Sequence, residues 1–161
     1  MSEAPRGDHD SRPGEDHGAS SAQQPPDGDS YAWYRRGLDL LGRGSPAAAA
    51  QLLERAAEAE PGARSVLEAL ARAQFDTGRY SDAADSFRQI VDASPSDDYA
   101  HFGLGLALAR GGDPAAAAEH LALAAAMRPE LRHYTEALRG VRATLRARAE
   151  AGATPPGDEP S

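Results

Sequence analysis

The sequence predicts an all-α protein in which pairs of antiparallel helices stack into a solenoid of seven helices between two irregular tails. Between residues 30 and 150 the apolar residues follow helical spacing, and no alternating strand pattern is present. Residue types also recur every 34 positions, which indicates helical units that stack on their neighbours. The recurring residues are Pro61, Pro95 and Pro129; Gly44, Gly78 and Gly112; and Ala49, Ala83 and Ala117.

Each unit is expected to contain two helices joined by a short turn. Three side chains that can cap a helix N-terminus, Ser45, Ser81 and Asp113, precede the second helices. Pro46 and Pro114 follow two of them, at the first helical position, which proline favours. The first helices are predicted over 30–42, 64–77 and 98–110, and the second helices over 46–59, 81–93 and 114–127.

Equivalent positions of the three units share a pattern of small, large apolar and proline residues. They are Trp33, Gly37, Leu40, Ala49, Leu53, Ala56 and Pro61 in the first copy; Leu67, Leu70, Ala71, Tyr80, Ala83, Phe87, Ile90 and Pro95 in the second; and Leu104, Gly105, Leu108, Ala117, Leu121, Ala124 and Pro129 in the third. This pattern resembles the tetratricopeptide repeat position by position. The resemblance covers residues 30–131 and implies three repeats, 30–63, 64–97 and 98–131, in a repeat domain that spans 30–150.

Small residues stand where the two helices of a repeat must approach closely. They are Gly37, Ala71 and Gly105, together with Ala49, Ala83 and Ala117. Two polar residues depart from the pattern, because His101 replaces the aromatic Trp33 and Gln74 stands where the other copies have leucine. We therefore expect the first helices of the second and third repeats to pack less tightly.

One further helix is predicted after Pro129, up to about residue 150. An amphipathic helix in this place can cover the last apolar face of a solenoid. We interpret its arginine face as solvated, with docking of an acidic partner or of the acidic N-terminal tail as the alternatives. The apolar face carries Leu131, Tyr134, Leu138, Val141 and Leu145, and the other face carries Arg132, Arg139, Arg142 and Arg146.

Residues 1–29 and 151–161 are predicted to be disordered tails, because they are rich in proline, glycine and serine and nearly devoid of large apolar residues. The chain carries a formal charge of −8, with 17 arginines against 25 acidic residues. Seven acidic residues and two arginines lie in the N-terminal tail, and 16 acidic residues and 15 arginines lie in residues 30–150. The repeat domain is therefore nearly neutral, and the acidity belongs to the tails.

The composition excludes several classes of function. The chain has no lysine for a phosphate-binding loop, Schiff base or kinase site, and no cysteine for a thiol nucleophile, disulfide or metal thiolate. A pI near 5.0 argues against general nucleic-acid binding. No apolar run suits a membrane span or a signal peptide. We expect a cytoplasmic protein that is not an enzyme and needs no cofactor, and the alanine- and arginine-rich composition favours a bacterial source.

Other candidate sites have simpler interpretations. His9 and His17 lie beside aspartates in the predicted tail, which makes a poor preformed metal site. His101, His120 and His133 lack the spacing of a helical zinc site, so we interpret them as packing or surface residues. The glycines of 103–112 lie within a predicted apolar helix and follow no strand, which favours packing over phosphate binding. No metal site is predicted.

The resemblance to tetratricopeptide repeats implies that the first helices line a concave groove that receives a peptide or a partner helix. None of the groove residues is expected to be needed for packing within the repeats. Gly103, next to Phe102, is expected to open a pocket. The predicted groove residues are Tyr31, Tyr34, Leu38 and Leu41 from the first repeat; Glu68, Arg72 and Phe75 from the second; Tyr99, Phe102, Leu106 and Arg110 from the third; and His133 with Glu136 from the last helix.

Five of the nine aromatic residues of the chain are assigned to this groove, which indicates a ligand with an apolar or aromatic anchor. Polar contacts are expected from Glu68, Arg72 and Arg110. A subset of the family binds C-terminal carboxylates through lysine and asparagine, and neither occurs here, so we expect no carboxylate clamp. The residues at the clamp positions are Tyr34, Leu38, Glu68, Arg72, Phe102 and Leu106.

The sequence therefore predicts a non-enzymatic adaptor that binds a protein or peptide partner, with no nucleic-acid or membrane partner. The alternative is a structural self-association module, a homo-oligomer whose groove is filled by another copy or by the protein's own tail. A further alternative is that the groove aromatics only pack on one another.

Overall fold

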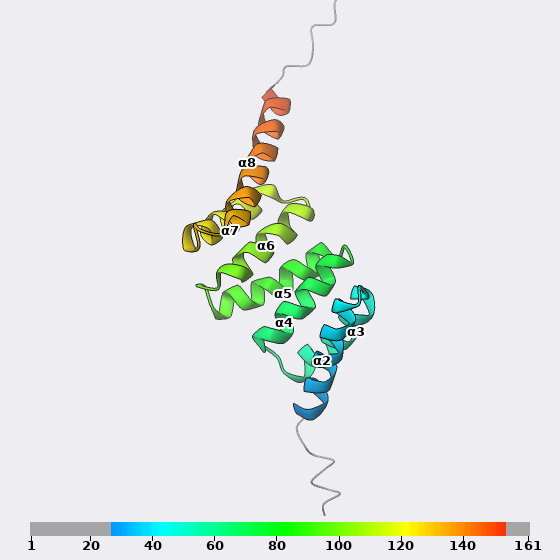
Figure 1. Ribbon diagram of the computed structural model, residues 1–161. Helices are drawn as coiled ribbons and strands as arrows, with labels where there is room; N and C mark the ends of the chain where they lie inside the picture. Colours follow the sequence, from blue (N-terminus) through cyan, green and yellow to red (C-terminus); the bar gives the residue numbers. More distant parts are fainter. Residues whose placement is uncertain (1–26, 154–161) are drawn as a thin grey trace, which may run out of the picture.

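The computed structural model describes residues 27–153, and these form seven α-helices and no strand. Predictions for residues 1–26 and 154–161, including those for His9 and His17, lie outside the described residues. The helices stack from α2 and α3 at one end to α8 at the other (Figure 1), and the predicted all-α solenoid is confirmed. The helices are α2 (Asp27–Gly42), α3 (Pro46–Ala59), α4 (Arg64–Asp76), α5 (Tyr80–Ala93), α6 (Asp98–Arg110), α7 (Pro114–Met127) and α8 (Arg132–Ala153).

The helix bounds depart from the predicted ones mainly at the two ends. Because α2 begins at Asp27 and α8 ends at Ala153, three residues at each end are helical rather than part of a tail. The buried Ser30 donates a hydrogen bond from Oγ to Oε1 of Glu60 at 2.8 Å, which ties the first turn of α2 to the end of α3. The last turns of α8 are exposed, and the high helix propensity of alanine and arginine favours their continuation.

A glycine in the left-handed region ends the first helix of each repeat. Gly44, Gly78 and Gly112 have φ angles of 77°, 81° and 97°, which side chains other than that of glycine rarely allow. The next residue donates its backbone N–H to the carbonyl five positions earlier, as Ser45 does to Leu40 at 2.8 Å. This Schellman arrangement terminates helices, and it explains why glycine recurs with the repeat period.

One of the three predicted capping side chains makes the expected hydrogen bond. Asp113 accepts from the backbone N–H of Ala116 at 3.1 Å. Ser45 occupies the N-cap of α3 with nearly the same backbone conformation but makes no side-chain cap bond. Ser81 lies inside α5, which begins at Tyr80. The predicted N-cap position is therefore confirmed for Ser45 without the side-chain hydrogen bond, and the capping prediction is wrong for Ser81.

Close contacts between paired helices hold each repeat together. A Cβ atom added to Gly37 would lie 2.6 Å from Cγ of Leu53, and one added to Gly105 would lie 2.6 Å from Cγ of Leu121. Both leucines are fully buried. The prediction that small residues let the paired helices approach is confirmed, and the core continues along the stack as three clusters of buried residues.

The two polar departures from the repeat pattern are buried and hydrogen-bonded. Gln74 is 5% exposed, and its Oε1 accepts from Oγ of Ser86 at 2.8 Å. His101 is 4% exposed, and its Nε2 lies 2.8 Å from the carbonyl oxygen of Pro95. The two polar residues are not exposed by the change in residue type, because each polar group has a partner and is buried as completely as an apolar core residue.

Helix α8 covers the end of the stack. Tyr134, Leu138 and Val141 are buried, and Leu145 packs against the same cluster as the buried residues of α7. The predicted capping helix is confirmed. The arginines on its other face are all exposed.

Candidate functional site

Five of the predicted groove residues line one pocket formed by α4, α5 and α6. The pocket has a volume of about 240 Å³. The sequence also predicts that Gly103 opens it, whereas Asp76 and Phe87 are additions that the structure reveals. We call this site the aromatic pocket, and its residues are Arg72, Phe75, Asp76, Phe87, Tyr99, Phe102, Gly103 and Leu106.

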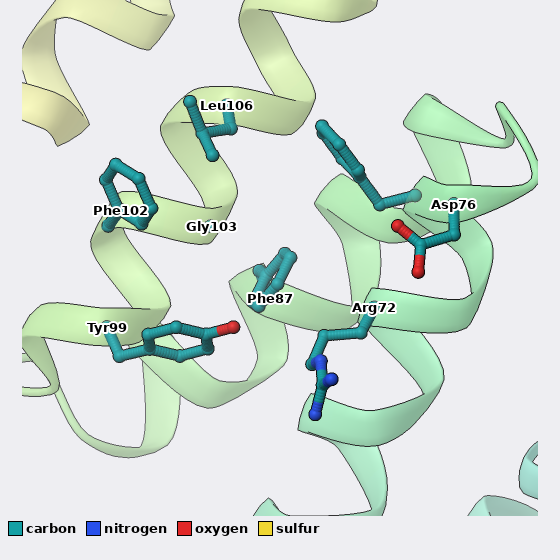
Figure 2. Close-up of a pocket in the computed structure, with 8 residues that line it drawn as sticks. Arg72, Asp76, Phe87, Tyr99, Phe102, Gly103 and Leu106 are labelled. Atoms are coloured by element: carbon teal, nitrogen blue, oxygen red, sulfur yellow. The ribbon is translucent and has the colours of Figure 1, made fainter. Parts of the chain in front are cut away.

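Phe87 from α5 forms the floor of the aromatic pocket. Its side chain is 3% exposed, and Figure 2 shows it in the middle of the lining residues. The ring fits against α6 because Gly103 has no side chain, since a Cβ there would lie 2.4 Å from the ring. Tyr99 packs edge-on to Phe87, with ring centroids 6.3 Å apart. The repeat pattern assigns Phe87 to the core. The signal in the sequence that the Phe87 ring also borders a pocket is Gly103, which has no side chain to cover that ring.

Three polar groups border the pocket without partners in the described part of the chain. Arg72 and Asp76 lie one turn apart on α4, and neither makes a hydrogen bond or ion pair there. The hydroxyl of Tyr99 is likewise unpaired among these residues, and it points toward the interior of the pocket (Figure 2). Burial raises the pKa of Tyr99, and the charge of Glu68 adds to the effect. At neutral pH the Tyr99 hydroxyl is therefore a hydrogen-bond donor.

Arg110 and Glu68, two further predicted groove residues, are engaged within the protein. The guanidinium carbon of Arg110 lies 5.8 Å from the ring centroid of Phe75, within the range of a cation–π contact. Glu68 forms an ion pair with Arg64, whose Nε also lies 2.7 Å from Oδ2 of Asp97. Glu68 is therefore not the free polar contact that the sequence predicts.

Phe102 and His133 belong to an aromatic cluster that connects the pocket to α8. Phe102 stacks on Tyr134 with ring centroids 4.5 Å apart, and His133 meets Phe102 edge-on at 5.2 Å. Tyr134 is 2% exposed and donates its hydroxyl to Oδ2 of Asp98 at 2.8 Å. Phe102 thus forms a wall of the pocket and part of the contact with the capping helix.

The groove residues of the first repeat lie apart from the aromatic pocket. Tyr31 and Tyr34 border a second hollow of about 420 Å³, which also includes residues from the loop between α3 and α4. Tyr31 is 59% exposed, whereas Leu38 and Leu41 pack against the core cluster of α3 and α4.

The expectation that groove residues take no part in the repeat packing is wrong for six of the thirteen. Each first helix packs against the second helix of its own repeat and, from α4 on, against that of the preceding repeat, so a side chain on its groove side can also contact the core. The groove residues that pack against core clusters are Tyr34, Leu38, Leu41, Phe75, Tyr99 and Phe102.

His101 and His120 pair between α6 and α7, with their Nδ1 atoms 3.1 Å apart. The carbonyl of Pro95 can only accept, so Nε2 of His101 donates to it, and when His101 is neutral its Nδ1 accepts from His120. Burial lowers the pKa of His120, and the charges of His101 and Arg88 add to the effect. His101 thus has the packing role that the sequence predicts.

In the part of the chain that the structure describes, no three metal-binding side chains lie together. None of the helices in residues 27–153 is both long enough and apolar enough to cross a membrane.

Solved structures of several repeat proteins share this fold. The Sgt2 TPR domain from Aspergillus fumigatus has a TM-score of 0.70 and 21% identity, over 83% of this chain and 89% of that one. MamA from Desulfovibrio magneticus RS-1 has a TM-score of 0.70 and 20% identity, over 76% and 70%. The first TPR of Spaghetti (RPAP3), solved with the HSP90 peptide SRMEEVD, has a TM-score of 0.68 and 17% identity, over 73% and 93%.

At the level of sequence, none of the curated proteins matches this chain significantly. The family model of the tetratricopeptide repeat matches residues 34–98 and, in an overlapping second match, residues 69–131. Together with the 34-residue period and the seven stacked helices, these matches show that the chain belongs to the tetratricopeptide repeat family.

Proposed function

We propose that this protein is a non-enzymatic adaptor that binds a segment of a partner protein in the aromatic pocket. The observation that carries the proposal is the apolar floor at Phe87 combined with Arg72, Asp76 and the Tyr99 hydroxyl around it, which have no partner among residues 27–153. An apolar hollow with a few convergent polar groups is the usual form of a binding site. Proteins of this family generally act as interaction modules, and one structural neighbour, YrrB, is a TPR protein with an unusual peptide-binding site.

The size of the pocket favours one anchoring side chain over a whole small molecule. Its volume of about 240 Å³ is below the range of about 300 to 1,000 Å³ that small-molecule sites usually have. We propose that a leucine or an aromatic side chain of the partner enters the pocket. Arg72 then pairs with a carboxylate beside the anchor, and the Tyr99 hydroxyl donates to a backbone carbonyl of the partner.

The proposed ligand is an internal segment rather than a C-terminal tail. The chain contains neither lysine nor asparagine, and the carboxylate clamp of the family uses both. An apolar anchor with a neighbouring acidic residue is the chemistry that the pocket of this chain can recognise.

The proposal is tested with two pocket variants and a matched control. The partner is recovered by affinity purification from cell extract, and binding of its purified segment is measured by calorimetry. Leu106→Asp places a charge on the apolar wall, and Arg72→Ala removes the unpaired cation. We expect Leu106→Asp to weaken binding by about tenfold or more, since burying a large apolar side chain is worth about 1.5 to 3 kcal/mol.

Leu123→Asp is the control, because Leu123 is an exposed leucine of α7 that does not line the pocket. It is expected to leave binding unchanged, and circular dichroism checks that each variant is helical. Full affinity in a folded Leu106→Asp variant contradicts the proposal. Sedimentation of the same proteins tests self-association, since a dimer that dissociates only in Leu106→Asp would place a second copy in the pocket.

A further inference from the structure

We infer that the arginine-bearing face of α8 is a second docking surface, which binds an acidic helix of a partner protein where a fourth repeat would have its second helix. Helix α8 is equivalent to the first helix of a repeat. Its buried Tyr134 and Leu138 stand 34 positions after Ala100 and Leu104 of α6, which are buried as well. It packs against α7 as α6 packs against α5.

In the complete repeats, the second helix covers one face of the first. Gly37 and Gly105 lie on that face, since a Cβ at either position would collide with a leucine of the second helix. The equivalent residue of α8 is Arg139, which is exposed. This face of α8 is not covered by any residue of 27–153, and a long cation stands on it where the repeats have a glycine or alanine.

The exposed side of α8 carries a regular stripe, which we call the arginine face. It consists of Arg132, Thr135, Arg139, Arg142 and Arg146, at alternating intervals of three and four residues. That spacing forms a line that meets a single neighbouring helix along its length. Two hollows of about 250 and 280 Å³ follow the line and share Thr135 and Arg139. The shape fits a helix better than a compact ligand.

No ion pair within residues 27–153 compensates the charges of the arginine face. Its four arginines form no ion pair with any residue that the structure describes, whereas Arg64 and Arg79 of the repeats each bind two carboxylates. Glu136 is the one acidic residue that lines either hollow. A row of free guanidinium groups favours carboxylates. The occupant is therefore a helix with aspartate or glutamate at intervals of three and four residues.

A partner protein fits this surface better than the protein's own acidic N-terminal stretch. Helix α2 begins at the end of the stack opposite α8 (Figure 1). The sequence before α2 also contains prolines at 5, 13, 25 and 26, and the interior of a helix does not accommodate proline.

The test uses a synthetic helix based on the second helices of this protein. The probe has the sequence of α7 with glutamate in place of the buried Ala117, Leu121 and Ala124, and the control peptide has glutamine there. Fluorescence anisotropy measures binding of each peptide to the full chain. We expect the glutamate peptide to bind about tenfold or more tightly than the glutamine peptide, to gain helicity on binding and to weaken as salt is added.

Paired arginine variants locate the binding surface. Arg139→Ala with Arg142→Ala is expected to weaken binding of the glutamate peptide by about tenfold, which corresponds to two ion pairs of under 1 kcal/mol each. Replacing the same two residues by lysine should retain most of the affinity. The matched control is Arg35→Ala with Arg36→Ala, which removes two exposed arginines of α2 and should leave the affinity unchanged.

Four results overturn the proposal. The first is that the glutamate and glutamine peptides bind with equal affinity. The second is that the Arg139/Arg142 and Arg35/Arg36 double-alanine variants lose equal affinity for the glutamate peptide. The third is a rise in affinity when residues 1–26 are deleted, which would assign the face to the protein's own tail. The fourth is displacement of the peptide by a short DNA duplex at an equal or lower concentration, which would assign the face to nucleic acid.

Discussion

The ring of Phe87 in α5 occupies the space that a side chain at Gly103 of α6 would need. The distance from the ring to an ideal Cβ on Gly103 is 2.4 Å, well inside van der Waals contact. Gly103→Ala must therefore displace a buried ring that is also the floor of the aromatic pocket. We expect the free energy of unfolding to fall by about 1 to 3 kcal/mol, as measured by urea denaturation.

Gly140→Ala is the matched control for that change. Gly140 also lies within a helix, but a Cβ there would have no neighbour within 4 Å. Alanine favours the helix, so the free energy of unfolding should rise by about 0.5 to 1 kcal/mol. Equal stability of the two variants would show that Phe87 and Gly103 are not in close contact.

Tyr134→Phe tests how the capping helix is attached. The change removes the hydrogen bond to Asp98 and leaves the stacking on Phe102 in place. Because the acceptor is a carboxylate, we expect the free energy of unfolding to fall by about 1.5 to 3 kcal/mol, and amide hydrogen exchange in α8 to become faster. Tyr31→Phe, at an exposed position, should change stability by less than about 0.5 kcal/mol. Unchanged exchange in Tyr134→Phe would contradict this attachment.

The ion pair between Arg64 and Asp97 predicts a change of stability in acid. The hydrogen bond from Arg64 holds the pKa of Asp97 below its usual value of 3.8. A carboxylate of this kind stabilises the fold above its unfolded pKa, and its contribution is lost as the pH falls through the lower folded pKa. Arg64→Ala should therefore destabilise the protein at pH 7, and the difference should shrink as the pH falls below 3.8.

Denaturation midpoints measured from pH 7 down to acid check this prediction. Arg43→Ala removes an exposed pair with Asp39 and should have little effect at any pH. A difference between Arg64→Ala and the unsubstituted protein that is independent of pH would show that Asp97 is not the group involved.

His120 predicts a second pH effect, nearer neutrality. Burial lowers its pKa below the usual 6.5, so the unfolded chain binds more protons than the folded chain just below that pH. Stability should therefore decline as the pH falls through 6.5, until the folded pKa is reached. His120→Gln removes the titrating imidazole, while the glutamine amide can still donate to His101. The stability of this variant should therefore depend less on pH in this range. The exposed His133→Gln serves as control, and an identical flattening in that variant would contradict the assignment.

Much of the fold was predictable from sequence because the repeat period reports contacts within each repeat. Gly105 and Leu121 stand where Gly37 and Leu53 stand 68 positions earlier, and both pairs make the same close contact. The ends of the domain were harder to predict. Ser30 joins α2 to Glu60 through a hydrogen bond that occurs once, and no repeated pattern can reveal a contact of that kind.

The candidate site was predictable in part. The register of the first helices placed Arg72, Tyr99 and Leu106 on one face, and all three line the aromatic pocket. Arg64 and Glu68 pair four residues apart on α4, a spacing that the sequence shows, whereas the sequence does not show that Arg64 also reaches Asp97, the residue before α6. That interaction depends on how neighbouring repeats stack.

The sequence by itself determined the family, the helix pairs and the capping helix, since each follows from local propensity and from contacts that recur every 34 residues. Only the tertiary structure decided that Phe87 belongs to the pocket. The exposure of the arginine face of α8 among residues 27–153 agrees with the solvated face that the sequence predicts. The reason is physical. Contacts within a repeat are nearly the same in every copy and so leave a periodic pattern, whereas contacts between repeats depend on the angle and spacing of the stack.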